Sequence, residues 1–195
     1  DRPIVIGGDH QYPPFEFLDE RGRPAGFTVE LTRAIAREMG MDVQIRLAPW
    51  EDTVASLRDG RIDAIQGMFY SSERSRLFDF SPHYLVLHCV SAVRRGTGPP
   101  PTAIEELAGR DLVVQAADAI LDELAERGIE ARIHAVATQA DVIRAVAEGR
   151  YDCGLATRYG ALYAIRKHGW TNIALRDRSP YSRQYASAVS KAQRA

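Results

Sequence analysis

Two features of the sequence predict an α/β fold organised as two lobes of similar build. Short apolar strand-like runs alternate with helical runs along the chain, which favours a mostly parallel sheet covered by helices. In addition, residues 57–64 (LRDGRIDA) resemble residues 146–153 (VAEGRYDC), since each passes from a helix end through glycine, arginine, a bulky residue and aspartate into a strand. Either two similar lobes or one common helix-to-strand turn used twice explains this repeat. The length of 195 residues suits one large domain or two small ones.

The chain before residue 67 is expected to contain strands at 4–6, 43–47 and 62–65 and a short helix at 50–60. Two prolines favour an extended loop over residues 12–17. Thr28 is expected to cap a longer helix that ends at Gly40. Several apolar residues of that helix lie on one helical face: Leu31, Ala34, Ile35 and Met39.

The rest of the chain continues the alternation. Residues 84–93 form a β-type run long enough to bridge two lobes, and residues 94–101, with two glycines and three prolines, form a loop. The expected helices that follow lie at 104–107, 119–127, 140–148 and 159–167. The expected strands lie at 112–115, 133–136, 152–156, 173–175 and 185–189.

Composition excludes several classes of partner. Apolar residues make up 45% of the chain and charged residues 26%, which is ordinary for a folded domain. The net charge of -1 gives no electrostatic basis for binding nucleic acid or an anionic membrane surface. No apolar run approaches the ~18 residues of a membrane span. Because the sequence starts at Asp1 without a signal-like segment, we expect a processed product or an excised fragment.

Cysteine and histidine usage predicts neither a metal site nor a bound cofactor. Cys89 and Cys153 lie in separate apolar strand-like runs, so we expect two buried free thiols. The five histidines are scattered, and none forms an HExxH motif or an i, i+4 pair.

The segment from Gly67 to Tyr84 (GMFYSSERSRLFDFSPHY) carries the most informative chemistry. It places Arg74 in a short helical turn just after a strand, beside hydroxyl and aromatic side chains. A guanidinium offers a planar fork of donors that matches a carboxylate, and aromatic faces hold an organic ligand body. The alternative is a solvated surface turn formed by Glu73, Arg74 and Arg76.

The expected topology predicts where a ligand would lie. In open α/β sheets, ligands bind beyond the carboxyl ends of the strands. Those ends fall at Gly67–Tyr70 in one half of the chain and at Thr157–Arg158 in the other. The sequence therefore favours two lobes that face each other across a cleft.

Five motifs, in this order and spacing, resemble the bacterial solute-binding proteins of family 3, the polar amino-acid-binding type. They are GDHQYPPFEF (8–17), GFTVEL (26–31), GRID (60–63), SER (72–74) and DFSP (79–82). The resemblance covers essentially the whole chain. It implies a type II periplasmic binding fold, with two Rossmann-like lobes joined by two crossover strands and closing on ligand. Lobe one would comprise residues 1–87 and 186–195, and lobe two residues 88–185, with crossovers at 84–93 and 185–189.

The resemblance also implies a set of ligand-binding residues. Arg74 matches the arginine that pairs with the ligand α-carboxylate, and the turn from Gln115 through Ala117 to Asp118 matches one that offers backbone N–H groups to the same carboxylate. Trp50 either faces the cleft or packs structurally. The remaining residues implied to line the site are Asp9, Tyr12, Gly67, Met68, Phe69, Tyr70 and Thr157.

Three departures from the family pattern bear on the ligand and the role. Thr157 stands where amino-acid binders carry an acidic residue for the ligand ammonium, and Phe69 stands where transport-type members have a hydroxyl. Asp9 or Asp118 could replace that acid, so a carboxylate with or without an amine remains open. The chain also ends before the last one or two helices of free binding proteins. Segments 67–74 and 79–96 resemble periplasmic sensor domains of membrane-bound histidine kinases.

These observations leave three functional hypotheses. The first is an extracytoplasmic sensor domain of a histidine kinase, joined to a membrane-anchored signalling module in the same chain. The second is the free solute-binding protein of an ABC importer, with a permease as partner. The third is an enzyme resembling cyclohexadienyl dehydratases, with Glu16 and Glu73 as candidate acids. No GxSxG motif, P-loop or metal cluster supports it. The resemblance implies a binding protein rather than an enzyme, in the periplasm or otherwise outside the cytoplasm.

Overall fold

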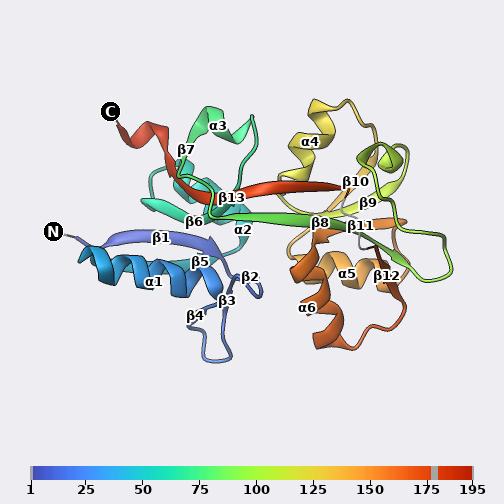
Figure 1. Cartoon of the computed structure of the whole chain (residues 1–195), viewed down its shortest axis with the longest axis horizontal. Helices are drawn as coiled ribbons and strands as arrows, with labels where there is room; N and C mark the ends of the chain where they lie inside the picture. The colour runs from blue at the N-terminus through green and yellow to red at the C-terminus, as the bar shows by residue number, and fades with distance from the viewer. Residues whose placement is uncertain (1, 177–179, 195) are drawn as a thin grey trace. The chain divides into compact units, whose positions relative to one another are not determined.

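The computed structural model describes residues 2–176 and 180–194 and confirms the predicted α/β fold (Figure 1). The chain divides into two compact units, unit 1 (residues 1–85 and 184–195) and unit 2 (residues 86–183). It passes from one unit to the other twice, inside strand β8 (Leu85–Arg94) and inside strand β13 (Tyr181–Ser190). Two long strands therefore carry the connections between the units.

Unit 1 combines a mixed sheet with a small antiparallel sheet. Its elements are β1 (Ile4–Asp9), β2 (Gln11–Tyr12), β3 (Glu16–Leu18), β4 (Pro24–Ala25), α1 (Phe27–Met39), β5 (Val43–Ala48), α2 (Trp50–Arg58), β6 (Ala64–Phe69), α3 (Arg74–Leu77), β7 (Phe78–Phe80) and a 3₁₀ turn, η2 (Lys191–Arg194). Strand β1 pairs in parallel with β5 and β6, and β13 pairs antiparallel with β6 and β7. Strands β2, β3 and β4 form the small sheet.

Helix α1 differs from the expectation at its start and on its buried face. It begins at Phe27 after Gly26, whose φ of 114° suits glycine, and Thr28 does not cap it. The Thr28 hydroxyl donates to the Phe15 carbonyl instead. The end at Gly40 is confirmed, with a left-handed backbone. The expected apolar face is largely exposed at Ile35 and Met39, and the buried residues are Thr28, Val29 and Ala36.

Two further elements of unit 1 differ from the expectation. The segment 12–17, expected as a loop, holds the ends of two short paired strands, β2 and β3. Strand β6 begins at Ala64 and continues to Phe69, so it includes the first residues of the Gly67–Tyr84 segment. Around it lies the core of unit 1, formed by Val5, Leu57, Ile62, Ile65, Met68, Phe78 and Ala188.

Unit 2 is a sheet buried on both faces. Its elements besides β8 are η1, a 3₁₀ turn (Ile104–Leu107), β9 (Asp111–Gln115), α4 (Ile120–Glu126), β10 (Arg132–Val136), α5 (Gln139–Ala147), β11 (Cys153–Thr157), α6 (Arg158–His168) and β12 (Ile173–Leu175). Strand β9 pairs in parallel with β10 and β11, and β8 pairs antiparallel with β11 and β12.

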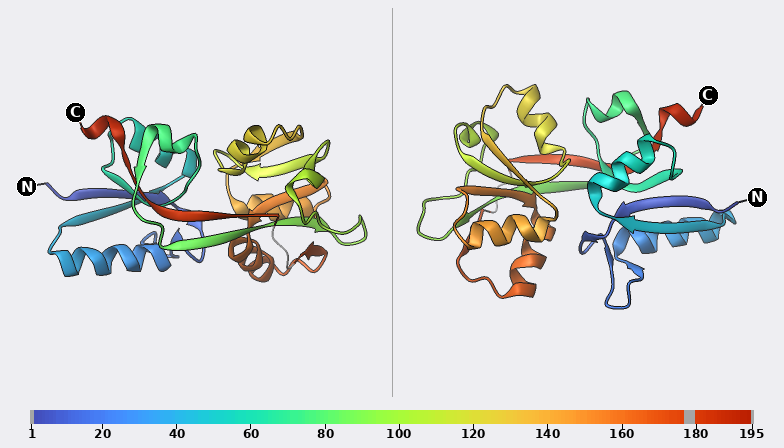
Figure 2. Two further views of the ribbon diagram at one scale, coloured as in Figure 1. Left: turned by 45° about the horizontal axis from the view of Figure 1, so that its top comes forward. Right: turned by 180° about the vertical axis from the view of Figure 1, so that it is seen from behind.

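Strand β9 shows how the two faces of that sheet are filled. Because side chains alternate along a strand, Leu112 and Val114 join a cluster with Ile120 of α4, whereas Val113 joins a cluster with Val142 of α5. Figure 2 shows the helices of unit 2 on both sides of its strands. This continuous apolar patterning is typical of a sheet covered on both faces.

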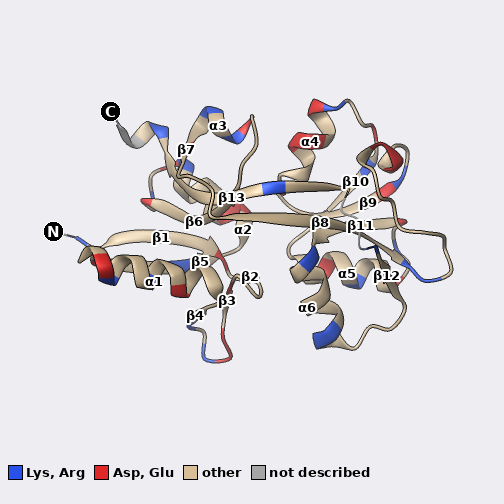
Figure 3. Cartoon of the chain, viewed as in Figure 1, with Lys and Arg blue, Asp and Glu red and all other residues tan. Residues whose placement is uncertain are grey.

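The elements show neither a segregation of charge nor a membrane-spanning helix among the described residues (Figure 3). Basic and acidic residues are interspersed along helices and loops of both units (Figure 3). Among the described residues, no helix is long and apolar enough to cross a membrane. Cys89 and Cys153 are buried free thiols, as predicted.

Candidate functional site

Two of the predicted ligand residues of unit 1, Asp9 and Phe69, lie at the carboxyl ends of neighbouring strands. Strand β1 ends at Asp9 and strand β6 ends at Phe69, and the two strands pair in parallel. Parallel strands that are neighbours end at the same edge of a sheet, so these residues share one edge.

Arg74 is held close to this edge by contacts on three sides. Its guanidinium carbon lies 5.7 Å from the centre of the Trp50 ring, and Nη1 donates a hydrogen bond of 3.0 Å to the Phe69 carbonyl. Its backbone N–H donates to the Ser71 hydroxyl. The residue is 9% exposed, so Arg74 is not the solvated arginine of the alternative interpretation. A buried guanidinium in contact with an indole face is a pre-positioned donor fork.

Trp50 combines packing in the core of unit 1 with a contact to Arg74. As the first residue of α2, it packs against the core of unit 1 on one side. It also lies within cation–π distance of Arg74. The packing fixes the ring, and the ring in turn limits the positions that the guanidinium can take.

Tyr12 and Phe69 belong to an aromatic cluster centred on Tyr185. The Tyr185 ring centroid lies 6.4 Å from that of Tyr12 and 5.1 Å from that of Phe69. Phe15 and Tyr84 complete the cluster. Sequence reasoning did not identify Tyr185 as important, because nothing local distinguishes it from the other residues of its β-type run.

Two of the predicted site residues, Gly67 and Met68, offer no side chain to a ligand. The side chain of Met68 is fully buried in the core of unit 1. A Cβ atom on Gly67 would lie 2.3 Å from the Tyr185 hydroxyl oxygen, so glycine is needed for the ring to lie there. Any ligand contact from these two residues would come from the backbone. Tyr70, by contrast, is 41% exposed and packs edge-on against Phe80.

In unit 2 the predicted residues lie at the carboxyl ends of β9 and β11, which are parallel neighbours. Ala117 adopts a φ of 58°, an uncommon conformation for a residue with a Cβ and one that costs roughly 1 kcal/mol. The carboxylate of Asp118 accepts the backbone N–H of Ile120, the first residue of α4. The turn from Gln115 to Asp118 is therefore a strained and locally bonded connection, a type that is common at functional sites.

The hydroxyl of Thr157 is engaged by a residue that the sequence did not reveal. Oε1 of Gln139 accepts both the Thr157 backbone N–H at 3.0 Å and the Thr157 hydroxyl at 2.9 Å. Gly160 allows this contact, since a Cβ there would lie 2.5 Å from Gln139 Oε1. A glutamine at the start of a helix carries no sequence signal for such a role.

Glu16 is the second residue whose setting only the structure shows. Its carboxyl group is fully buried, and burial raises its pKa to about 8. The backbone N–H of Asp9 donates to it at 2.7 Å. Glu16 thus lies directly behind one of the predicted ligand residues.

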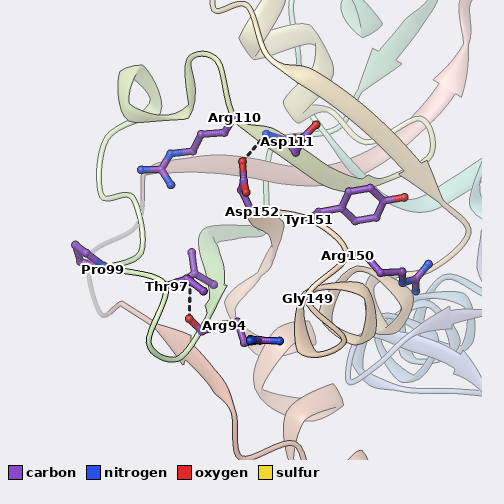
Figure 4. Close-up of a pocket in the computed structure, with 10 residues that line it drawn as sticks. Arg94, Thr97, Pro99, Arg110, Asp111, Gly149, Arg150, Tyr151 and Asp152 are labelled. Carbon is purple, nitrogen blue, oxygen red and sulfur yellow. Dashed lines mark hydrogen bonds between the residues drawn. The ribbon is translucent and has the colours of Figure 1, made fainter.

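A cavity of about 270 Å³ in unit 2 lies away from all of these residues (Figure 4). It borders the amino-terminal ends of β9 and β11, the opposite edge from Gln115 and Thr157. Its lining includes Arg94, Arg110 and Asp152 but none of the predicted site residues. The cavity therefore does not identify the predicted site.

Comparisons with known proteins bear on the family and the fold of this chain. The model of the bacterial extracellular solute-binding proteins, family 3, matches residues 4–135. The L-cystine-binding protein TcyJ of Escherichia coli (strain K12) is 27% identical over 168 residues, which cover 84% of this chain and 62% of TcyJ. This chain thus spans less than two thirds of that relative.

Two solved structures extend the comparison to the whole fold. A histidine kinase sensor domain with similarity to periplasmic binding proteins superposes with a TM-score of 0.91 and 38% identity, over 97% of this chain and 83% of that one. The arginine-bound form of truncated ArgBP from T. maritima gives a TM-score of 0.82 and 28% identity, over 98% and 89%. All three are binding or sensor proteins. With its type II periplasmic binding fold, the chain belongs to the bacterial extracellular solute-binding proteins of family 3.

Proposed function

We propose that this chain is the extracytoplasmic sensor domain of a membrane-tethered histidine kinase and that it binds a small carboxylate or an amino acid. The buried Arg74 guanidinium carries the ligand assignment. It lies at a strand-end edge, in contact with Trp50 and bonded to the Phe69 carbonyl. A carboxylate that pairs with such a fork gains charge-assisted hydrogen bonds away from bulk water.

The sensor role rests on similarity to the sensor domain, which is the more identical of the two solved structures compared above and matches 97% of this chain. The importer role is the second candidate, because TcyJ and ArgBP are named as binding proteins. The two roles share the fold and the proposed ligand residues, so separating them requires an experiment on the full-length protein or its partners.

We further propose that each unit contributes ligand contacts. In unit 1 these are Arg74, Asp9, Tyr12 and Trp50, and in unit 2 the turn from Gln115 to Asp118. The side chain of Thr157 ends in a neutral hydroxyl, which bonds to Gln139. It therefore offers no negative charge to a ligand amine. A ligand without an amine, or one whose amine pairs with Asp9 or Asp118, fits these side chains best.

A thermal-shift screen tests the ligand class. The panel pairs amino acids with acids that lack the amine, such as L-glutamate with glutarate, and includes L-arginine and L-cystine. A ligand present at about a hundred times its Kd stabilises the folded protein by roughly 2.7 kcal/mol. Failure of every carboxylate in the panel to shift the melting temperature would contradict the proposal.

Variants of two neighbouring arginines then test Arg74. We expect Arg74→Lys to fold and to bind the identified ligand at least ~10-fold more weakly, because lysine lacks the planar fork. Arg76→Ala is the matched control, since Arg76 lies in the same helical turn with its side chain 74% exposed. Equal affinity of Arg74→Lys and wild type would refute the role of Arg74.

Autophosphorylation separates sensor from importer. In membranes that contain the full-length receptor, the identified ligand should change the rate of kinase autophosphorylation. A complete gene that encodes only a binding protein beside permease genes would favour the importer instead.

A further inference from the structure

Glu16 places a carboxyl group in the interior of unit 1. It is the first residue of β3, its side chain is fully buried, and Oε2 lies close to the backbone of Gly8. A Cβ on Gly8 would be 2.5 Å from this oxygen, so glycine is required at that position of β1. An ionised carboxylate in such a setting loses its hydration, a cost that only close partners offset.

Three elements supply those partners. The backbone N–H of Asp9, at the end of β1, donates to Oε1 at 2.7 Å. The side-chain amide of Gln66, in β6, donates to Oε2 at 2.6 Å. The hydroxyl of Thr28, in α1, lies 3.2 Å from the same Oε2. Glu16 therefore joins β1, β6 and α1 behind the proposed ligand edge.

The hydrogen-bond count at Thr28 indicates which form of Glu16 is present. The Thr28 hydroxyl has one proton and donates it to the Phe15 carbonyl at 2.8 Å, the shorter of its two contacts. The contact with Glu16 then needs a proton from the other side, which a carboxylic acid supplies and a carboxylate does not. The neutral acid thus satisfies every group at this junction.

The electrostatic surroundings favour the same form. Among the residues that the structure describes, no cationic side chain bonds to Glu16 or pairs with it. The titratable groups that face it are Asp9 of β1, Tyr84 before β8 and Tyr185 of β13. Asp9 in turn has His10 beside it, with Nδ1 of His10 3.4 Å from Oδ1 of Asp9. Burial, together with the negative charge of Asp9, raises the pKa of Glu16 to about 8, and the contacts with the Asp9 N–H, Gln66 and Thr28 oppose that rise.

We propose that Glu16 is a positioning residue that works as a neutral carboxylic acid, fixing the main chain of Asp9, and that its ionisation repels the Asp9 carboxylate. Ionisation removes the proton shared with Thr28 and puts a second negative charge beside Asp9, inside the protein. Because Asp9 is a proposed ligand contact, the functional consequence rests on the proposed function. Ligand affinity would then depend on pH, through a residue that does not itself touch the ligand.

The pH titration of the Asp9 amide in NMR spectra tests this proposal without a ligand. In the wild type we expect the amide resonance to shift with a midpoint near pH 8, where Glu16 ionises. In Glu16→Gln the shift should vanish. Glu20→Gln, at an exposed site in the turn after β3, is the control and should titrate like the wild type. An Asp9 amide that does not respond between pH 6 and 10 in the wild type (roughly two units either side of the expected pKa) overturns the proposal.

Thr28→Val gives a second test that does not depend on how well Glu16→Gln folds. If Glu16 donates its proton to Thr28, removal of the hydroxyl destabilises the neutral form, and the midpoint of the Asp9 titration falls. If Thr28 instead donates to an ionised Glu16, the midpoint rises, and the proposal is wrong. Neither measurement uses a ligand. Their failure is therefore distinct from failure of the proposed function, which would appear as silence in the ligand panel.

Discussion

Asp63 and Asp152 make the same pair of backbone hydrogen bonds in their respective units. Asp63 donates its N–H to the Val5 carbonyl and accepts the Val5 N–H on Oδ2, both at 2.8 Å. Asp152 does the same with Asp111 at 3.1 Å (Figure 4). The repeated segment in the sequence therefore performs one task twice, since each aspartate ties a helix-to-strand turn to the beginning of the neighbouring parallel strand, β1 or β9.

Replacement of Asp63 should destabilise the protein in a pH-dependent way. Arg2 donates two hydrogen bonds to Asp63, and with the Val5 N–H they lower the pKa of its carboxyl group to about 2. The ionised form thus stabilises the folded state above about pH 4, the ordinary pKa, and this contribution is lost as the pH falls through 2. We expect Asp63→Ala to lower the free energy of unfolding by about 1 kcal/mol at pH 7.

Urea denaturation at several pH values measures this difference. The gap between wild type and Asp63→Ala should narrow as the pH approaches 2. Most of the loss should come from the buried backbone donor, because the side chain of Arg2 is 70% exposed and such ion pairs contribute little. Arg2→Ala is the control, and a loss as large as that of Asp63→Ala would contradict this explanation.

Gly67→Ala should strain the contact between β6 and β13. Its Cβ would lie 2.3–2.4 Å from the hydroxyl oxygen and two ring carbons of Tyr185, a side chain that cannot move away because four other rings surround it. We expect a loss of about 1–3 kcal/mol of stability in thermal or chemical unfolding. In a double-mutant cycle, Tyr185→Leu should make the glycine replacement less costly. Simple additivity of the two changes would show that the contact does not matter.

The two thiols should be unreactive in the folded protein. Burial raises the pKa of both Cys89 and Cys153 to about 12, so the thiolate, the reactive form, is scarce at neutral pH. We expect a thiol reagent such as DTNB to label both residues only after unfolding in denaturant. Rapid labelling of one cysteine in native buffer would show that its strand opens locally.

Loss of the Gln139 side chain should leave two buried donors of Thr157 without their acceptor. Gln139→Leu introduces an apolar side chain of similar size that cannot accept the Thr157 N–H or hydroxyl. We expect a decrease of about 1–3 kcal/mol in the free energy of unfolding. Gln44→Leu, at an exposed position in β5, is the control and should change stability little. Similar effects of the two replacements would argue against the assigned role of Gln139.

Much of the architecture follows from patterns that are local in the sequence. The strand at 43–47 was predicted from alternation of apolar residues and is observed as β5. Gly40 was predicted to end a helix and does so with a left-handed backbone, and Gly169 ends α6 in the same way. Such signals are readable because the backbone of a turn or a strand constrains the residues that can occupy it.

Other features depend on partners far away along the chain. The sequence places Thr28 at a helix start, but its hydroxyl bonds to Phe15, a partner that local spacing does not reveal. Likewise, the sequence named Glu16 as a candidate acid but did not show what surrounds its side chain. Its burial against Gly8 and Gln66 exists only because three elements meet around it.

By itself, the sequence determined the α/β class, the order of the elements, the solute-binding family and the choice of Arg74 as the candidate partner of a ligand carboxylate. Only the tertiary structure decided that Arg74 is buried over Trp50, that Tyr185 occupies the space above Gly67, and that Glu16 is fully enclosed. The physical reason is the same in each case. Burial and pKa shifts depend on atoms that folding brings together from distant positions, whereas periodicity and turns depend on neighbours in the chain.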